Sequence, residues 1–154
     1  MRTAVAAGLF VFIGGVYSAD AGGFATFTTP PRGSPDRTRI LDLMRKPMES
    51  VFGKPIEFDV RTISVSGNYA FAWLHPQRPG GVPLVINFPC EVDGRDLVIE
   101  ATFVRKNNAW VFDTPADGQP GFCADDVTSW DGWLKEKGLP PQFAGRAKYL
   151  SDSD

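Results

Sequence analysis

The chain has 154 residues, with 16 Lys and Arg against 18 Asp and Glu, and its formal net charge at pH 7 is −2. A balance so close to neutral gives no long-range field that would attract a nucleic acid or an anionic membrane surface. A single histidine excludes metal sites built on a histidine pair, and we predict neither a metal nor an organic cofactor.

The first 21 residues have the three parts of a cleavable secretory signal. Arg2 supplies a basic start, residues 4–16 are all apolar or glycine, and residues 19–21 place small side chains at both cleavage positions. A membrane-spanning helix needs about 20 apolar residues, so we predict cleavage after Ala21, with Ser18 or Ala19 as alternatives. The protein is then expected to be periplasmic or secreted, without a membrane partner after cleavage.

The predicted export determines which oxidation state we expect for the two cysteines. In an oxidising compartment, pairing of Cys90 with Cys123 is the default for a two-cysteine chain. The alternative is two buried free thiols, because a sequence does not show whether two Cα atoms are close enough for a bond. We predict the disulfide.

Residues 22–33 predict a mobile arm. They have no hydrophobic period and contain Pro30, Pro31 and Gly33. We therefore expect ordered structure to begin at Ser34, with a single domain over residues 34–150.

A helix is predicted at the start of this domain. Ser34 is a good N-cap, Pro35 fits the first helical position, and Asp36 places a carboxylate in the first turn. Apolar residues then recur at spacings of three and four until Gly53, which ends the helix. Pro47 lies inside and lacks an amide hydrogen, so it is expected to bend the helix or split its last turn.

From Ile56 the apolar period changes to two, which predicts a half-buried strand. The apolar phase switches at Ile63, and we expect a β-bulge near Thr62. A turn at residues 67–68 leads into a returning strand with aromatic residues on one face and smaller apolar residues on the other. These are Tyr69, Phe71 and Trp73 against Ala70, Ala72 and Leu74.

The following segment is rich in proline and glycine, which predicts a loop over residues 75–83 and then a short strand over residues 84–88. A second hairpin is predicted from residues 97–105 and 109–113, because Asn107 and Asn108 between them tolerate the positive φ of a tight turn. Its register places Phe103 opposite Phe112 and Arg105 opposite Trp110.

A short C-terminal helix is predicted from Val127, Trp130 and Leu134, which follow Asp125 and Asp126 and precede a stop at Gly138. The order of elements predicts an α+β fold. We expect an N-terminal helix packed on a curved antiparallel sheet of four or five strands, followed by the short C-terminal helix.

No catalytic motif stands out, and three residues are weak candidates for an acid or a base. His75 is interpreted as a polar residue at a strand end. Asp59 shares a strand face with Glu57, and we expect solvent on that face. Glu100 lies in mid-strand, where it becomes a carboxylate in a pocket if the N-terminal helix covers its face, and an ordinary carboxylate if not.

Three tryptophans and one arginine are the candidate binding residues. Trp73 and Trp110 occur at strand spacing, which is typical of a core. Trp133 flanks the apolar face of the predicted C-terminal helix, so we expect it to be partly exposed. Arg78 belongs to the 75–83 loop, which we expect to contribute to binding together with the concave sheet face.

Several segments carry a resemblance: R-x-x-I-L-D-L-M-R-x-P-x-E at 37–49, G-K-P-I-E-F at 53–58, V-S-G-N-Y-A-F at 65–71, P-Q-R-P at 76–79 and the Asp126 to Pro140 region. Together they resemble a group of uncharacterised small exported bacterial proteins, which implies a bacterial envelope origin and no functional residues. The cysteine segments 89–96 and 120–123 depart from this pattern. One helix on a curved sheet is also similar to the cystatin-like or NTF2-like architecture, by fold analogy alone.

We therefore expect an exported, non-enzymatic domain that binds a small ligand or a protein partner. The alternative is an NTF2-like hydrolase or isomerase that uses Glu100 or Asp59 with His75 in a hydrophobic cavity. A third hypothesis is an inhibitor or envelope-stress protein that acts through an exposed loop.

Overall fold

Within residues 25–86, 97–113 and 129–145, which the computed structural model describes, one helix precedes a sheet and a second helix follows it. The elements are α1 (Pro35–Phe52), β1 (Glu57–Ser66), β2 (Tyr69–Arg78), β3 (Val82–Pro83), β4 (Ile99–Lys106), β5 (Ala109–Phe112), α2 (Ser129–Glu136) and a short 3-10 helix, η1 (Pro141–Ala144). This order confirms the α+β prediction. Neither α-helix in these ranges is long and apolar enough to cross a membrane. The predicted signal at 1–21 and both cysteines, Cys90 and Cys123, lie outside the described residues.

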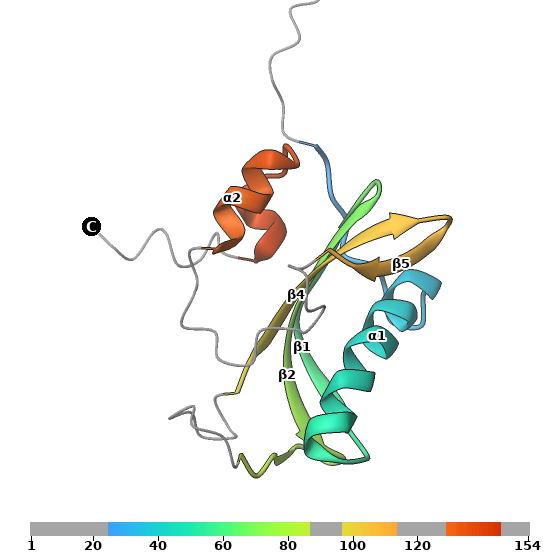
Figure 1. Cartoon of the computed structure of the whole chain (residues 1–154), viewed down its shortest axis with the longest axis vertical. Coiled ribbons are helices and arrows are strands. Elements are labelled where there is room, and N and C mark those ends of the chain that lie inside the picture. The colour runs from blue at the N-terminus through green and yellow to red at the C-terminus, as the bar shows by residue number, and fades with distance from the viewer. Residues whose placement is uncertain (1–24, 87–96, 114–128, 146–154) are drawn as a thin grey trace, which may run out of the picture.

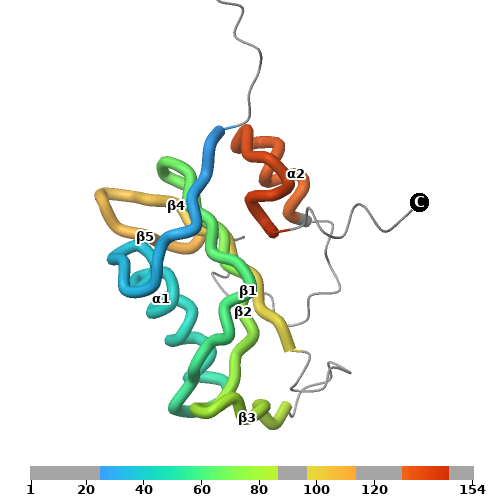
Figure 2. The backbone as a smooth tube through the Cα atoms, turned by 180° about the vertical axis from the view of Figure 1, so that it is seen from behind, coloured from blue at the N-terminus to red at the C-terminus, as the bar shows by residue number. Residues whose placement is uncertain are grey.

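The sheet is antiparallel and lies between the helices. Its strands follow the order β1-β2-β4-β5, and β3 pairs with β2 off this path. Figure 1 shows α1 on one side of the sheet and α2 on the other, and the view from behind in Figure 2 agrees. The predicted packing of the N-terminal helix on the sheet is confirmed, and the second helix covers the opposite face.

The two sheet faces support two separate cores. The core under α1 includes Ile40, Met44, Met48, Ile63, Ala70, Ala72, Leu74, Ile99, Ala101 and Phe103. The core under α2 and η1 consists of Phe71, Leu134, Leu139, Phe143 and Ala144, with several aromatic rings packed against it. β2 contributes to both cores through alternate residues, as its sequence predicts.

The predicted bulge in β1 is confirmed. The register of β1 against β2 shifts between Val60 and Thr62. Without an extra residue, the apolar side chains before and after this point would face opposite sides of the sheet, because side chains alternate along a strand. The bulge brings them all to the core under α1, where Phe58, Val60, Ile63 and Val65 pack.

Helix α1 continues through Pro47 without a split last turn, so that part of the prediction is wrong. Pro47 lacks the amide hydrogen that would bond one turn back. Met44 and Met48 on either side of it are fully buried. Packing of an apolar face contributes more to helix stability than one backbone hydrogen bond, and the helix therefore reaches Phe52.

The prediction that order begins at Ser34 is wrong, because residues 25–33 of the arm lie against the domain. Thr28 pairs with Val65 on the outer edge of β1 through two backbone hydrogen bonds of 2.8 and 2.9 Å. Phe27 packs edge to face on Phe143, with ring centroids 5.6 Å apart. Figure 2 shows the arm running beside β1. Contacts of single residues such as these produce no period in the sequence.

The predicted loop at residues 75–83 is also wrong. β2 continues to Arg78, and β3 folds back on its end. His75 therefore lies inside a strand rather than at its end. Among the described residues, β4 pairs with β2 only as far as Leu74. Pro76 lies beyond this pairing, where the sheet is narrower, and its missing amide hydrogen is therefore tolerated. Of the strand predicted at 84–88, the described part, 84–86, is not a strand.

The second hairpin has the predicted register, with Phe103 opposite Phe112 and Arg105 opposite Trp110. Two asparagines with φ of 49° and 63° join its strands. The two phenylalanine rings stack at 5.1 Å between centroids, and the arginine guanidinium lies 4.3 Å from the centroid of the tryptophan ring.

Arg78 caps the C-terminal end of α1. Its guanidinium donates hydrogen bonds to the carbonyl oxygens of Phe52, of Gly53 at 2.7 Å and of Pro55 at 3.0 Å. The last carbonyls of a helix lack partners within the helix, and a cation there also interacts favourably with the helix dipole. Arg78, a binding candidate from the sequence, thus has a structural role in the fold.

Replacing Arg78 with methionine removes these hydrogen bonds and keeps much of the apolar stem. We expect the free energy of unfolding to fall by about 1–3 kcal/mol, the range for hydrogen bonds to a charged group. Urea unfolding followed by circular dichroism measures the change. Arg61→Met is the matched control, because Arg61 makes an exposed ion pair with Asp59 and should contribute less than about 1 kcal/mol. Equal losses in the two variants would contradict the capping role.

Candidate functional site

The predicted site residues divide between the two faces of the sheet. His75 lies opposite Asp59 and Trp73 lies opposite Glu100, so these four share the face away from α1. Trp110 belongs to the core under α1. The structure therefore does not bring Trp110 together with Trp73 and Glu100 around one cavity.

His75 is held by the backbone rather than by a carboxylate. Its side chain is nearly buried, at 8% exposure, and its Nδ1 lies 2.6 Å from the carbonyl oxygen of Leu97. A carbonyl oxygen only accepts, so Nδ1 donates this hydrogen bond. Asp59 on the neighbouring strand is half exposed and lies 3.5 Å from the Arg61 guanidinium.

Glu100 is covered by α2, where the sequence left open whether α1 would cover it. It is 9% exposed, and the indole Nε1 of Trp130 donates a hydrogen bond to its Oε2. The Trp130 ring also packs edge to face on Phe71, with centroids 5.8 Å apart. Glu100 thus anchors the second helix to β4.

Trp110 and Trp133 also donate to carboxylates. Trp110 is 3% exposed, and its Nε1 donates to Asp36 Oδ1 at 2.8 Å. Arg105 donates to the same oxygen at 2.9 Å, which joins the second hairpin to the first turn of α1. Trp133 is partly exposed, as predicted, and its Nε1 donates to Asp113 Oδ2 at 3.1 Å.

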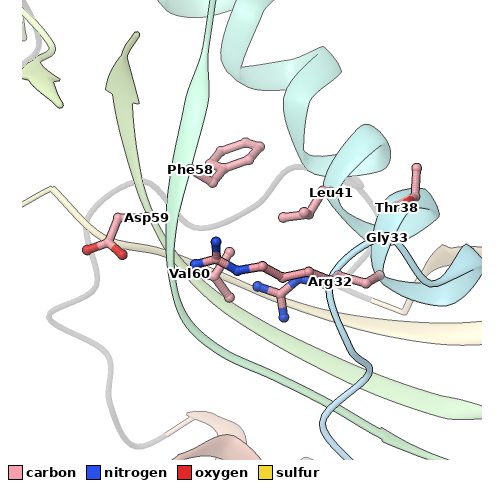
Figure 3. Close-up of a pocket in the computed structure, with 8 residues that line it drawn as sticks. Arg32, Gly33, Thr38, Leu41, Phe58, Asp59 and Val60 are labelled. Atoms are coloured by element: carbon pink, nitrogen blue, oxygen red, sulfur yellow. The ribbon is translucent and has the colours of Figure 1, made fainter. Parts of the chain in front are cut away.

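A groove that the sequence did not predict lies between α1, the end of the arm and the first half of β1. We call it the α1–β1 groove. Its volume is about 360 Å³, and its lining residues are Arg32, Gly33, Arg37, Thr38, Leu41, Phe58, Asp59 and Val60. Figure 3 shows Leu41 and Phe58 facing one another from the helix and the strand, with Arg32 between the arm and β1 and Asp59 on the other side of the strand.

Two arginines give this groove a positive charge. Arg32 is exposed and Arg37 is half-buried, and the Arg37 guanidinium donates to the carbonyl oxygen of Pro30 at 3.3 Å. Neither arginine forms an ion pair with any described residue. The neighbouring carboxylate of Asp36 is instead bound to Arg105. Two positive charges therefore lie beside a partly buried apolar wall.

The sequence contained one weak signal for this groove. Arg32 and Arg37 lie on either side of the start of α1, where the helix dipole disfavours positive charge. Such a locally unfavourable pair of charges can indicate a site for an anion. The groove itself was not predictable, because its walls come from three segments whose proximity depends on the position of the arm.

The described residues offer no metal centre. No group of three or more His, Cys, Asp or Glu side chains in these ranges could hold an ion. The charge of the α1–β1 groove favours an anionic ligand instead.

Trp130→Phe keeps the aromatic contact with Phe71 and removes the N–H that donates to Glu100. We expect the free energy of unfolding to fall by about 1–3 kcal/mol, because a buried carboxylate loses a donor. Adding Glu100→Gln should reduce this penalty, and the double-mutant cycle should give a coupling of about 1 kcal/mol. Urea unfolding of the four proteins measures it.

Trp133→Phe is the control for this cycle, since its N–H bonds to Asp113 rather than to Glu100. We expect a smaller loss and no coupling with Glu100→Gln. Strictly additive effects of Trp130→Phe and Glu100→Gln would show that the indole contact does not stabilise α2 on the sheet.

Comparison with known proteins provides no relative by which to interpret the groove. No family model, curated protein or solved structure matches the chain. The resemblance to small exported bacterial proteins and the cystatin-like or NTF2-like analogy therefore stay predictions.

Proposed function

We propose that this protein is an exported, non-enzymatic domain that binds an anionic ligand with an apolar part in the α1–β1 groove. The ligand is a small molecule or a segment of a protein partner. One observation carries the proposal: Arg32 and Arg37 line a groove with apolar walls and have no carboxylate partner among the described residues.

The chemistry of the groove suits such a ligand. A guanidinium presents a planar fork of N–H donors that binds a carboxylate or a phosphate with two hydrogen bonds. Leu41, Phe58 and Val60 are partly buried and can cover an alkyl or aromatic part of the ligand. A volume of about 360 Å³ is in the usual range for small-molecule sites. Because one arginine is exposed, we expect a dissociation constant of about 0.1–1 mM for a simple carboxylate.

The predicted signal at residues 1–21 supports the exported part of the proposal. Enzymes that depend on nucleotide cofactors lack these cofactors outside the cytoplasm. Export therefore favours a binding function over such an enzymatic one. The sequence also contains no catalytic motif, whereas the groove needs only charge and apolar surface. A periplasmic or secreted binding domain accounts for the predicted signal, the lack of a catalytic motif in the sequence and the charged, partly apolar groove.

Octanoate tests the groove, with octanamide as the neutral ligand of the same length. We expect octanoate to shift the amide NMR signals of residues 32–41 and 57–61, and octanamide to bind about ten-fold more weakly because it lacks the charge. The double variant Arg32→Gln with Arg37→Gln should lose most of this binding.

Arg39→Gln is the matched control, because Arg39 is an exposed arginine of α1 outside the groove lining. It should bind octanoate like the wild type. Equal affinity for octanoate and octanamide, or equal loss in the control and the double variant, would refute the proposed site.

The alternative function is a small NTF2-like hydrolase or isomerase. One observation favours it: Asp59, His75 and Glu100 share one sheet face. The binding proposal predicts that p-nitrophenyl acetate is hydrolysed no faster with the protein than in buffer. Wild-type hydrolysis that disappears in both His75→Asn and Asp59→Asn would instead favour the enzyme.

A further inference from the structure

Within the described part of the chain, the outer edge of β1 is only partly covered. Along its inner edge, β1 pairs with β2. On the outer edge the arm pairs at Val65 through Thr28, and no other described residue pairs there. The stretch Glu57–Arg61, which ends at the bulged residue Arg61, therefore presents backbone N–H and C=O groups to which a further strand can pair.

The arm shows that this edge accepts an extended segment. The amide of Thr28 donates to the carbonyl oxygen of Val65 at 2.9 Å, and the amide of Val65 donates back at 2.8 Å. The hydroxyl of Ser66 adds a hydrogen bond to the carbonyl oxygen of Thr26 at 2.7 Å. Next along the arm come the prolines at 30–31, which have no amide hydrogen for further pairing. The α1–β1 groove lies between the end of the arm and the first half of β1 (Figure 3).

The two sides of the uncovered stretch differ in charge. On the groove side, Phe58 and Val60 lie near the two arginines. On the other side, Glu57 and Asp59 are exposed, and Arg61 neutralises part of that negative charge. Side chains of an added strand alternate between the two sides. A matching strand therefore has acidic or apolar residues toward the groove and basic residues toward Glu57 and Asp59.

We propose that the partner of this groove is an extended polypeptide segment of alternating charge, which adds to β1 as a strand along Glu57–Arg61. This inference rests on the proposed function and names the partner of the same site. In strand addition, backbone hydrogen bonds supply affinity and pockets for alternate side chains supply specificity. The uncovered stretch spans about 16 Å at about 3.3 Å per residue, so about five residues of the partner pair with it.

A synthetic peptide tests this inference on the full chain. The probe is a capped eight-residue peptide in which lysine alternates with glutamate, with valine at one central glutamate position. We expect it to bind about ten-fold more tightly than octanoate, because backbone hydrogen bonds add to the charge contacts. Amide hydrogen exchange within residues 57–61 should slow on binding. The double variant Arg32→Gln with Arg37→Gln should bind about ten-fold more weakly, and Arg39→Gln should bind like the wild type.

Two altered peptides separate strand pairing from attraction by charge. Methylation of consecutive central amide nitrogens keeps every side chain and removes backbone donors, so binding should weaken about ten-fold. A peptide of the same composition with its acidic and basic residues in two blocks should also bind more weakly, because no register then matches both sides of β1.

The outcomes distinguish this inference from the proposed function. If octanoate binds in the groove but the alternating peptide does not, or if the methylated peptide binds as tightly as its parent, strand addition is overturned and the groove remains an anion site. If neither octanoate nor any peptide shifts the signals of the groove residues, both proposals fail.

Discussion

The central strand β2 is buried on both faces, and the remaining elements are arranged around this constraint. Ala70, Ala72 and Leu74 face the core under α1, while Phe71 faces the core under α2 and η1. A strand whose two sides are both apolar can avoid water only when each face is covered. The long helix covers the face with small side chains, which let it approach closely, and the aromatic face requires a second cover. The short C-terminal helix therefore has a structural purpose that its length does not indicate.

The groove follows from two further consequences of this packing. The bulge at Val60–Thr62 keeps all the apolar residues of β1 toward α1, which provides the apolar wall. The arm covers the edge of β1 after the bulge and ends beside its first half. A strand edge is usually blunted by bulges, charges or a covering segment. Among the described residues this covering segment pairs with β1 at Val65, and the proposed partner pairs with the stretch that leads to the bulge.

Most residues that the sequence suggested for chemistry are polar anchors of the fold. Arg78 satisfies carbonyls at the end of α1, Trp110 is joined to Asp36, and Glu100 accepts from Trp130. Buried polar groups are costly unless they are hydrogen-bonded. Anchors and catalytic residues therefore look alike in a sequence, since both are polar side chains at otherwise apolar positions. Only the identity of the partner separates them.

By itself, the sequence determined the elements whose signals are local. The cap at Ser34, the change of period at Ile56, the bulge near Thr62 and the paired asparagines of the second hairpin were readable because each depends on residues within a few positions of one another. The register of that hairpin followed from its turn alone. The α+β class is the sum of these local features.

Only the tertiary structure decided where the arm lies, how far β2 extends, which helix covers Glu100 and where Arg32 and Arg37 meet an apolar wall. Each of these depends on contacts between segments far apart in the chain, such as Thr28 with Val65 or Trp130 with Glu100. Such contacts are made by single residues and leave no period in the sequence. The signal at residues 1–21 is predicted from the sequence alone. The groove, in contrast, forms only because the arm folds back on the edge of the sheet.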